Sequence, residues 1–243
     1  MVHLINYSHN AYKKSQKKNS ITGLKFGEFD WVHQYNFEMI PNYFINNNKD
    51  ILSFKRGAGY WIWKPYIIWQ TLNLINLNDY VFYCDSGAYF TNSHKPSLNL
   101  MQEMSIDVMC YELDYFHYER KWCKSDARIL LNANDLLIMD TPQIMSGHIF
   151  LKNTTFTREL ISKWLTYAQD IRIVSDNKSV LAEENYDFVE NRHDQTIWSI
   201  LCKKNKILPF KDPSGIVLEE NTSYPTLARS KFSKWIENPR CRD

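Results

Sequence analysis

Four short segments carry residues whose types and spacing could do chemistry. In the first, the apolar run 80–84 ends abruptly in Asp85, Ser86 and Gly87. Ligands of α/β proteins bind beyond the carboxyl ends of strands, and hard divalent cations prefer oxygen ligands. Asp85 is therefore a candidate metal or nucleotide ligand. The alternative is a carboxylate that caps the next turn, with Gly87 at a positive φ.

The second segment is RGAGYWIWKPY, residues 56–66, in which two glycines open an aromatic run. Glycines let the backbone approach a ligand closely, and Arg56 could hold a diphosphate through two parallel hydrogen bonds. The pair lacks the third glycine of a dinucleotide-binding loop and follows no clear strand, so a Rossmann dehydrogenase fits poorly. The alternative is a tight turn with an exposed Arg56 and tryptophans that belong to the core.

The third segment places His193, Asp194 and Gln195 at the start of an apolar helix. Asp194 could take a proton from a sugar hydroxyl, and His193 could bind a metal or contact phosphate. The alternative is that Asp194 only caps the helix.

The fourth segment is Ser146, Gly147 and His148, inside an apolar strand pattern. A glycine within a strand often marks a bulge or a close ligand approach. A single histidine on a strand is, alternatively, structural. The sequence contains no P-loop, no H-E-x-x-H and no nucleophile elbow.

The elements that must position these segments alternate between strand and helix patterns. Strands are expected at 2–7, 80–84, 107–111 and 143–151, and helices within 29–45 and at 65–75, 98–104, 125–133, 154–168 and 194–202. The lysine-rich stretch 13–18 is expected to be a solvated loop or a helix end. This alternation predicts an α/β fold with a mainly parallel sheet flanked by helices. We expect one domain over residues 1–243, with an irregular tail from about residue 212.

The composition bounds the class of protein. Of the 243 residues, 44% are hydrophobic and 23% charged, which is typical of a soluble globular protein. The net charge of +2 is too small to indicate a nucleic-acid partner. Five cysteines, an odd number without a C-x-x-C pair, favour free thiols in a reducing compartment. With no signal peptide and no apolar run near the roughly 20 residues of a membrane span, we expect a cytoplasmic protein.

Peripheral contact with the inner face of a membrane is a further hypothesis, because the C-terminal residues mix basic and apolar side chains. The residues concerned are Arg229, Lys231, Phe232, Lys234, Trp235, Ile236, Arg240 and Arg242. The alternative is a C-terminal helix that packs on the domain.

Taken in order, four segments resemble GT-A type glycosyltransferases of the small bacterial and viral kind that build polysaccharides. They are RGAGYWIWKPYII (56–68), DYVFYCDSGAYF (79–90), QIMSGHIFLKN (143–153) and ENRHDQTIWSIL (190–201). The resemblance implies a nucleotide-sugar-binding α/β fold (Rossmann-like), with a divalent metal, Mn or Mg, on the diphosphate. Gly87 stands where many such enzymes carry a second Asp, which puts the number of metal ligands in doubt.

The resemblance also distributes roles among the candidate residues. Asp85 would serve the metal and the nucleotide, Ser146, Gly147 and His148 would line the donor or acceptor sugar, and His193, Asp194 and Gln195 would face the reacting sugars. The expected donor-binding set is Asn6, Arg56, Tyr60, Lys64, Asp85, Ser86 and Gly87.

The predicted activity is transfer of a hexose, galactose or galactofuranose by hypothesis, from a UDP-sugar to a surface polysaccharide or lipid-linked oligosaccharide. Gln195 stands where blood-group-type galactosyltransferases have an acidic residue, which favours inversion with Asp194 as the base. One alternative is a non-catalytic nucleotide- or carbohydrate-binding protein on the same fold. Another, a nucleotidyltransferase, would need a glycine-rich basic loop after the first strand, which residues 8–10 do not supply.

Overall fold

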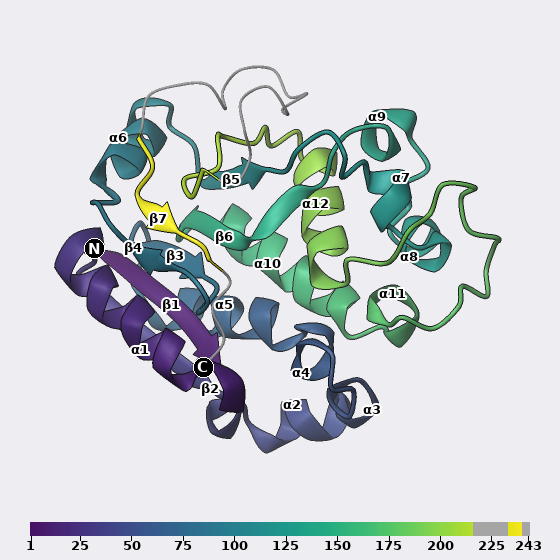
Figure 1. Cartoon of the computed structure of the whole chain (residues 1–243), viewed down its shortest axis with the longest axis horizontal. Coiled ribbons are helices and arrows are strands. Elements are labelled where there is room, and N and C mark those ends of the chain that lie inside the picture. The colour runs from purple at the N-terminus through teal and green to yellow at the C-terminus, as the bar shows by residue number, and fades with distance from the viewer. Residues whose placement is uncertain (216–232, 240–243) are drawn as a thin grey trace.

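The computed structural model describes residues 1–215 and 233–239. At its centre lies a five-stranded sheet (Figure 1), in the order β2 (Trp31–Asn36), β1 (Val2–Ser8), β3 (Tyr80–Cys84), β6 (Ile144–Lys152) and β5 (Val108–Glu112). Strand β1 pairs in parallel with β2 and β3, whereas β6 runs antiparallel to both β3 and β5. All strands except β6 therefore point the same way, and the predicted mainly parallel sheet flanked by helices is confirmed.

Helices cover both faces of the sheet. The longer helices are α1 (Lys13–Thr22), α5 (Trp63–Leu74), α6 (Lys95–Glu103), α10 (Thr155–Ala168) and α12 (Asp194–Lys204). The short ones are α2 (Asn42–Asn47), α3 (Lys49–Leu52), α4 (Gly57–Tyr60), α7 (Glu119–Trp122), α8 (Ser125–Leu130), α9 (Leu136–Met139) and α11 (Ile171–Val174), with single turns η1 (Asn10–Tyr12), η2 (Gly23–Gly27) and η3 (Phe37–Met39).

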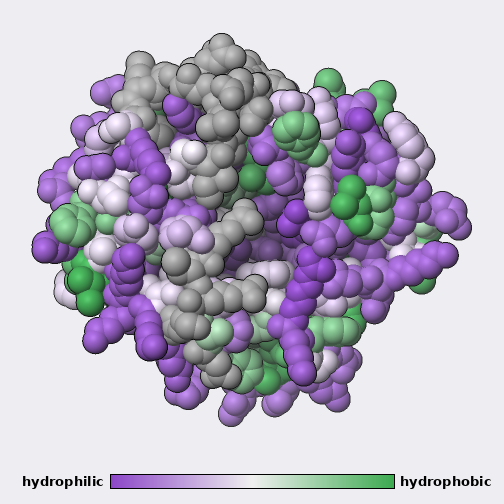
Figure 2. All heavy atoms as spheres, viewed as in Figure 1, coloured by the Kyte–Doolittle hydropathy of each residue, from purple (hydrophilic) through white to green (hydrophobic). Residues whose placement is uncertain are grey.

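Alternation along the strands divides the core into two layers. Ile5, Val81 and Ile149 face a cluster that includes residues of α5, α10 and α12. The intervening residues Leu4 and Phe82 face the opposite layer, which contains residues of α6 and of the small sheet β4 (Tyr89–Phe90) and β7 (Ile236–Glu237). Helix α1 contacts β1 and β4 on this second side. In Figure 2 hydrophilic side chains gather around a hollow near the centre of the visible face.

Two elements differ from the sequence-based expectation. The stretch 29–45 is helical in part, as expected, through η3 and the start of α2, but it also contains the edge strand β2, which was not expected. The residues of β2 are mostly half-buried or exposed and therefore show no clean alternation. The lysine-rich stretch 13–18, expected as a solvated loop or a helix end, forms the first part of α1, which continues to Thr22. Its periodicity is hidden because Gln16, Asn19 and Ser20 are the residues that it buries.

The prediction that C-terminal residues contact a membrane is wrong for Trp235 and Ile236. Trp235 and Ile236 are 1% and 0% exposed, because β7 pairs with β4 and packs on Phe82 and Phe90. They cannot face a bilayer, and the described residues 233–239 contain the two-residue strand β7 rather than the alternative helix. Lys234 pairs with Glu237. The other basic residues of this group, and most of the predicted irregular tail, lie outside the described residues.

The predicted free thiols are confirmed for Cys84, Cys110, Cys123 and Cys202, all of them buried, while Cys241 lies outside the described residues. Within residues 1–215 and 233–239, none of the helices combines the length and the apolar character that crossing a membrane requires.

Candidate functional site

All four predicted segments contribute one residue each to a cluster at one end of the sheet. Lys64 lies in the first turn of α5, Asp85 directly follows β3, Ser146 lies in β6, and Asp194 is the first residue of α12. The Lys64 Nζ is 2.9 Å from Asp194 Oδ2 and 3.5 Å from Asp85 Oδ1. Ser146 Oγ donates to Asp194 Oδ2 at 3.0 Å and lies 3.2 Å from Lys64 Nζ. These four residues are called the carboxylate–lysine cluster below.

Burial sets the electrostatics of this cluster. The side chains of Lys64 and Asp194 are 3% and 5% exposed, whereas that of Asp85 is 42% exposed. Burial lowers the pKa of the Lys64 ammonium, but the carboxylates of Asp194 and Asp85 outweigh it and raise the pKa above its usual value. Burial also raises the pKa of Asp194, more than the charge of Lys64 lowers it. Asp85 is therefore the carboxylate that an incoming ligand can reach.

The position of Asp85 depends on its neighbours in β3 and β6. Tyr83, two residues earlier in the strand, donates its hydroxyl to Asp85 Oδ1 at 2.5 Å. The Asp85 N–H donates to the Gly147 carbonyl at 2.9 Å, and a Cβ on Gly147 would lie 3.2 Å from Asp85 Oδ2. Gly147 therefore marks a close approach, as its place in a strand predicted, but the group that approaches it is the Asp85 carboxylate. Burial raises the pKa of Tyr83, helped by the charge of Asp85, so its hydroxyl stays a donor.

The remaining residues of the Asp85 turn shape the backbone. Ala88 N donates to the Asp85 carbonyl at 3.0 Å, so the turn is closed by the backbone and the carboxylate is not used as a cap. Gly87 has no positive φ, in contrast to the alternative considered from sequence. Ser86 Oγ donates to the Tyr7 carbonyl at 2.6 Å and is buried, which ties the ends of β1 and β3 together.

Asp194 and Gln195 make different kinds of contact: Asp194 belongs to the carboxylate–lysine cluster, and Gln195 connects α12 to β6. Asp194 is not a plain helix cap, because its carboxylate contacts Lys64 and Ser146. Gln195 bridges α12 to β6: its Oε1 accepts from Ser146 N at 3.4 Å, and its Nε2 donates to Gln143 Oε1 at 2.9 Å. The amide of Gln195 therefore holds structure rather than facing an open site.

His193 points to the other side of this helix start. Its ring stacks on Tyr60, with 5.0 Å between centroids, and its Nε2 is 3.0 Å from Asp176 Oδ1. Burial lowers the pKa of His193 to about 4, although Asp176 opposes the shift. The backbone of His193 has φ 56° and ψ −120°, a strained conformation for a residue with a side chain.

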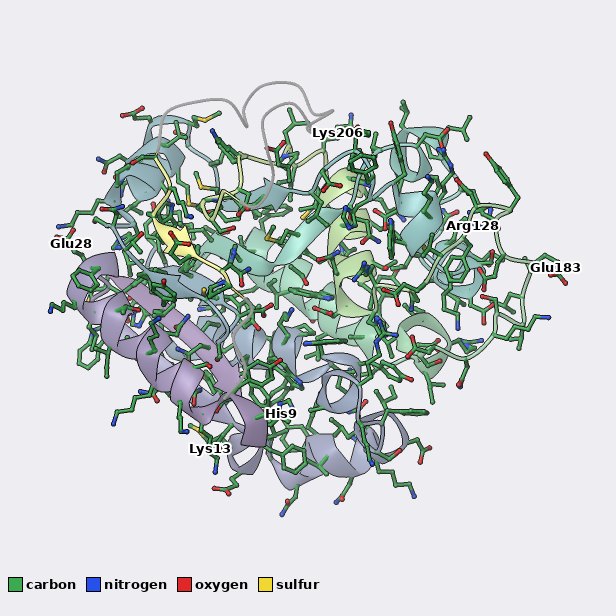
Figure 3. All side chains as sticks on the ribbon, in the orientation of Figure 1. His9, Lys13, Glu28, Arg128, Glu183 and Lys206 are labelled. Atoms are coloured by element: carbon green, nitrogen blue, oxygen red, sulfur yellow. The ribbon has the colours of Figure 1, made fainter. Side chains whose placement is uncertain are left out.

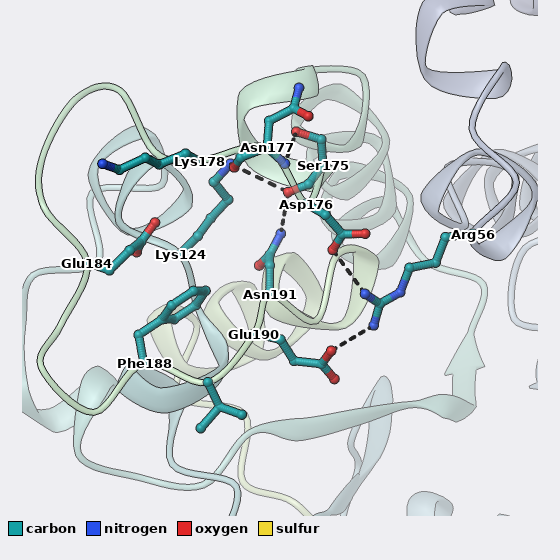
Figure 4. A pocket seen from close by; sticks show the side chains of 11 residues that line it. Arg56, Lys124, Ser175, Asp176, Asn177, Lys178, Glu184, Phe188, Glu190 and Asn191 are labelled. Carbon is teal, nitrogen blue, oxygen red and sulfur yellow. Dashed lines mark hydrogen bonds and ion pairs between the residues drawn. The ribbon is translucent and has the colours of Figure 1, made fainter.

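Arg56 lines a separate pocket of about 420 Å³ (Figure 4), and Asp176 in the lining of this pocket is also the residue that His193 contacts. Its guanidinium pairs with Asp176 at 3.1 Å and Glu190 at 3.0 Å. Gly57 and Gly59 both have positive φ, and a Cβ on Gly57 would collide with the Trp61 ring at 2.3 Å. These glycines make the tight turn considered as the alternative, and the structure pairs Arg56 with carboxylates other than those of the cluster.

Two of the predicted site residues, Asn6 and His148, do not belong to the carboxylate–lysine cluster. Asn6 is fully buried, and its amide bonds to Asn19, Ser20 and Gln16 between β1 and α1. His148 is also fully buried; it pairs in register with Cys84, and its Nδ1 is 3.6 Å from the Cys84 sulfur. Both face the α1 side of the sheet because strand residues alternate, so their geometry gives no support to ligand contact.

Two residues of this region were missed in the sequence. Tyr83 could have been found, because the residue two positions before Asp85 in a strand lies on the same face. Asp176 follows no motif, and its contacts with Arg56 and His193 join positions far apart in the chain.

A metal at this site would rest on Asp85. Among the described residues, no group of three or more His, Cys, Asp and Glu side chains could hold a metal. Magnesium, however, commonly keeps several waters and binds through one or two carboxylates plus the phosphates of a substrate. A half-exposed Asp85 whose Oδ1 is fixed by Tyr83 fits that mode.

Comparisons with known proteins agree with this architecture. No protein-family model matches the chain, and no curated protein sequence matches it significantly. The structure is similar to that of mouse xyloside xylosyltransferase 1, with a TM-score of 0.54 and 9% identity over 99% of this chain and 97% of that one. It is also similar to the galactosyltransferase LgtC in complex with donor and acceptor sugar analogs, with a TM-score of 0.52 and 11% identity over 97% of this chain and 86% of that one. The chain therefore has the GT-A fold of nucleotide-sugar transferases.

Proposed function

We propose that the protein is a glycosyltransferase that moves a hexose from a UDP-sugar to a surface polysaccharide or lipid-linked oligosaccharide. Galactose, as pyranose or furanose, is the hexose that we propose. The carboxylate–lysine cluster carries the proposal, because a half-exposed carboxylate, Asp85, and a buried one, Asp194, lie together at the carboxyl end of β3 in a GT-A fold. That end of an α/β sheet is where ligands bind.

On the donor side, Asp85 would bind the diphosphate through manganese or magnesium. The cation would neutralise the charge that develops on the leaving nucleoside diphosphate. The chain's own contribution is to fix Asp85: Tyr83 and Lys64 hold Oδ1, and the Gly147 carbonyl holds the backbone N–H. Such preorganisation avoids reorientation of the carboxylate when the ligand arrives.

On the acceptor side, we assign the base to Asp194 and the reaction to inversion. The raised pKa of Asp194 increases its affinity for the proton of an acceptor hydroxyl. Ser146 Oγ, which donates to Asp194 Oδ2 at 3.0 Å, would take that proton while passing its own to Asp194. Gln195 is a weak nucleophile, and its amide is engaged by Gln143 and Ser146. This supports inversion over a covalent intermediate at that position.

A second candidate is a non-catalytic nucleotide- or carbohydrate-binding protein on the same fold. Two features favour it: Asp194 is 5% exposed and paired with Lys64, and Gly87 stands where many GT-A enzymes carry a second Asp. The two candidates differ in turnover, since a binding protein releases no UDP from a UDP-sugar.

The first test is a thermal-shift screen of UDP, GDP, CMP, TDP and ADP with and without manganese, followed by UDP release from UDP-galactose. We expect stabilisation by UDP with manganese, lost in Asp85→Asn and kept in the control Asp50→Asn, an exposed residue of α3. Asp194→Asn should bind UDP as the wild type does and release it about 100-fold more slowly. Full turnover in a folded Asp194→Asn protein would refute the base assignment, and no response to any nucleotide would refute the proposed function.

A further inference from the structure

Helix α1 buries its polar side. Its buried residues are Gln16, Asn19 and Ser20, and their side chains bond to the sheet and its edge. Gln16 donates to Asn6 at 2.9 Å and accepts from Ser8 at 2.7 Å. Asn19 donates to the Ala88 carbonyl at 2.9 Å. Hydrogen bonds, rather than apolar packing, therefore hold α1 on the sheet.

The outward side of α1 and η2 carries the apolar residues. Ile21 and Leu24 are each 53% exposed and Phe26 is 42% exposed. This is the reverse of an ordinary surface helix, in which the apolar stripe faces the core. Exposed lysines surround these side chains, and the whole group is called the α1 surface below: Lys13, Lys14, Lys17, Lys18, Ile21, Leu24, Lys25 and Phe26.

The α1 surface is strongly basic. Glu28 lies just past η2, at the end of the element opposite to Lys13 (Figure 3), and its carboxylate pairs with Lys95 at 3.1 Å. Lys18 and Lys25 lie over the rings of Tyr89 and Phe26, so their stems cover apolar surface. At the lower left of Figure 2, over α1, hydrophilic side chains alternate with hydrophobic ones.

We propose that the α1 surface docks on an anionic phospholipid membrane. Lysines on such a surface are attracted to acidic headgroups, and neighbouring Ile, Leu and Phe side chains gain by entering the boundary of the acyl region. A nucleic acid would use the lysines but leave Ile21, Leu24 and Phe26 in water, which favours the membrane. The inference is independent of the proposed activity, because it rests on surface composition alone.

The α1 surface extends along one side of the sheet, from its carboxyl end to its amino end. Helix α1 begins just after β1 and η1, so Lys13 lies toward the carboxyl end of the sheet, where Asp85 lies. Ile21, Leu24 and Phe26 lie at the other end of α1 and in η2, so docking would lay the bilayer along the side of the sheet that α1 covers. Docking there would also replace the C-terminal site considered from sequence, whose Trp235 and Ile236 are buried.

The test is co-sedimentation of the full chain with vesicles of phosphatidylcholine alone or mixed equally with phosphatidylglycerol. We expect binding to the mixed vesicles only, weakened by salt. One variant removes charge: Lys14→Glu, Lys17→Glu and Lys25→Glu. A second removes apolar area: Ile21→Ser, Leu24→Ser and Phe26→Ser. A matched control reverses exposed lysines elsewhere, one of them in α10 on the opposite face of the sheet: Lys49→Glu, Lys55→Glu and Lys163→Glu.

The charge variant should lose about 100-fold or more in vesicle affinity, from about fivefold for each lysine. The apolar variant should lose about tenfold or more at unchanged charge. The control should bind as the wild type does. Equal loss in the control, wild-type binding by the apolar variant, or tighter binding to a short DNA duplex than to the vesicles would each overturn the proposal.

Discussion

Replacing Lys64 by Met removes the positive charge from the carboxylate–lysine cluster while keeping most of the side-chain volume. Asp194 then stays buried with its nearest counter-charge gone. The ammonium and carboxylate are 2.9 Å apart, with side chains 3% and 5% exposed. We therefore expect a large loss of stability at neutral pH, and one that depends on the charge of Asp194.

The magnitude follows from the geometry. At 2.9 Å and an effective dielectric constant of about 20, the attraction is about 6 kcal/mol. Part of this lost attraction is offset, because the variant no longer pays the free-energy cost of burying the lysine ammonium. Breaking a buried pair by removing one partner costs about 3–5 kcal/mol, and we expect a loss of that size in the free energy of unfolding.

The pH dependence gives the prediction its sign. The pKa of Asp194 is raised in the folded protein, so the folded state binds the proton more tightly than the unfolded state does. The stability contributed by this group therefore falls as the pH rises above about 4, through the folded pKa. Without Lys64 the folded pKa rises further, so the deficit of the variant relative to the wild type should shrink as the pH falls.

Urea unfolding followed by tryptophan fluorescence, at pH ~8 and pH ~5, measures this difference. Lys163→Met, at an exposed position of α10, is the control and should change stability by less than about 0.5 kcal/mol. The double variant Lys64→Met/Asp194→Asn should be more stable than Lys64→Met alone, since no unpaired charge is left at Asp194. A double variant no more stable than the single one, or a deficit that is the same at both pH values, would refute the reasoning.

Two further predictions concern the neighbours of the cluster. Gly147→Ala places a Cβ 3.2 Å from Asp85 Oδ2 and must displace that carboxylate, so we expect weaker binding of UDP with manganese but a change in stability below about 1 kcal/mol; calorimetric titration with unchanged affinity would contradict this. His193, with a folded pKa of about 4 against ~6.5 when unfolded, lowers stability as the pH falls from ~6.5 to ~4, by up to about 3 kcal/mol. His193→Asn should flatten this acid-side slope in unfolding experiments, and an unchanged slope would show that other groups cause it.

The parts of the fold that sequence predicts are those with strong local patterns. The apolar run before Asp85 stops at that residue, and the apolar pattern of the helix begins just after Asp194. The sequence therefore places Asp85 at the end of a strand and Asp194 at the start of a helix. The close approach at Gly147 was likewise signalled by a glycine within a strand.

The rest depends on long-range packing. A buried strand has the same apolar pattern in either direction, so the reversal of β6 left no local signal. Lys64 was assigned to the donor, and nothing near it in the chain indicates that it pairs with Asp194. The sequence does not predict helix α1 because its core-facing residues are polar, and their hydrogen bonds to Asn6 and Ser8 of β1 leave no apolar periodicity.

The Lys64–Asp194 pair also constrains how far the chain can fold while it is still being synthesised. Lys64 is made early, in the first turn of α5, whereas Asp194 opens α12, the last long helix of the described part of the chain. Until α12 has emerged, the ammonium lacks its Asp194 partner, and the apolar faces of α10 and β6 lack the helix that packs on them. The charge balance of the site is thus completed only after α12 has been made, and the nascent chain must carry an unfinished core until then.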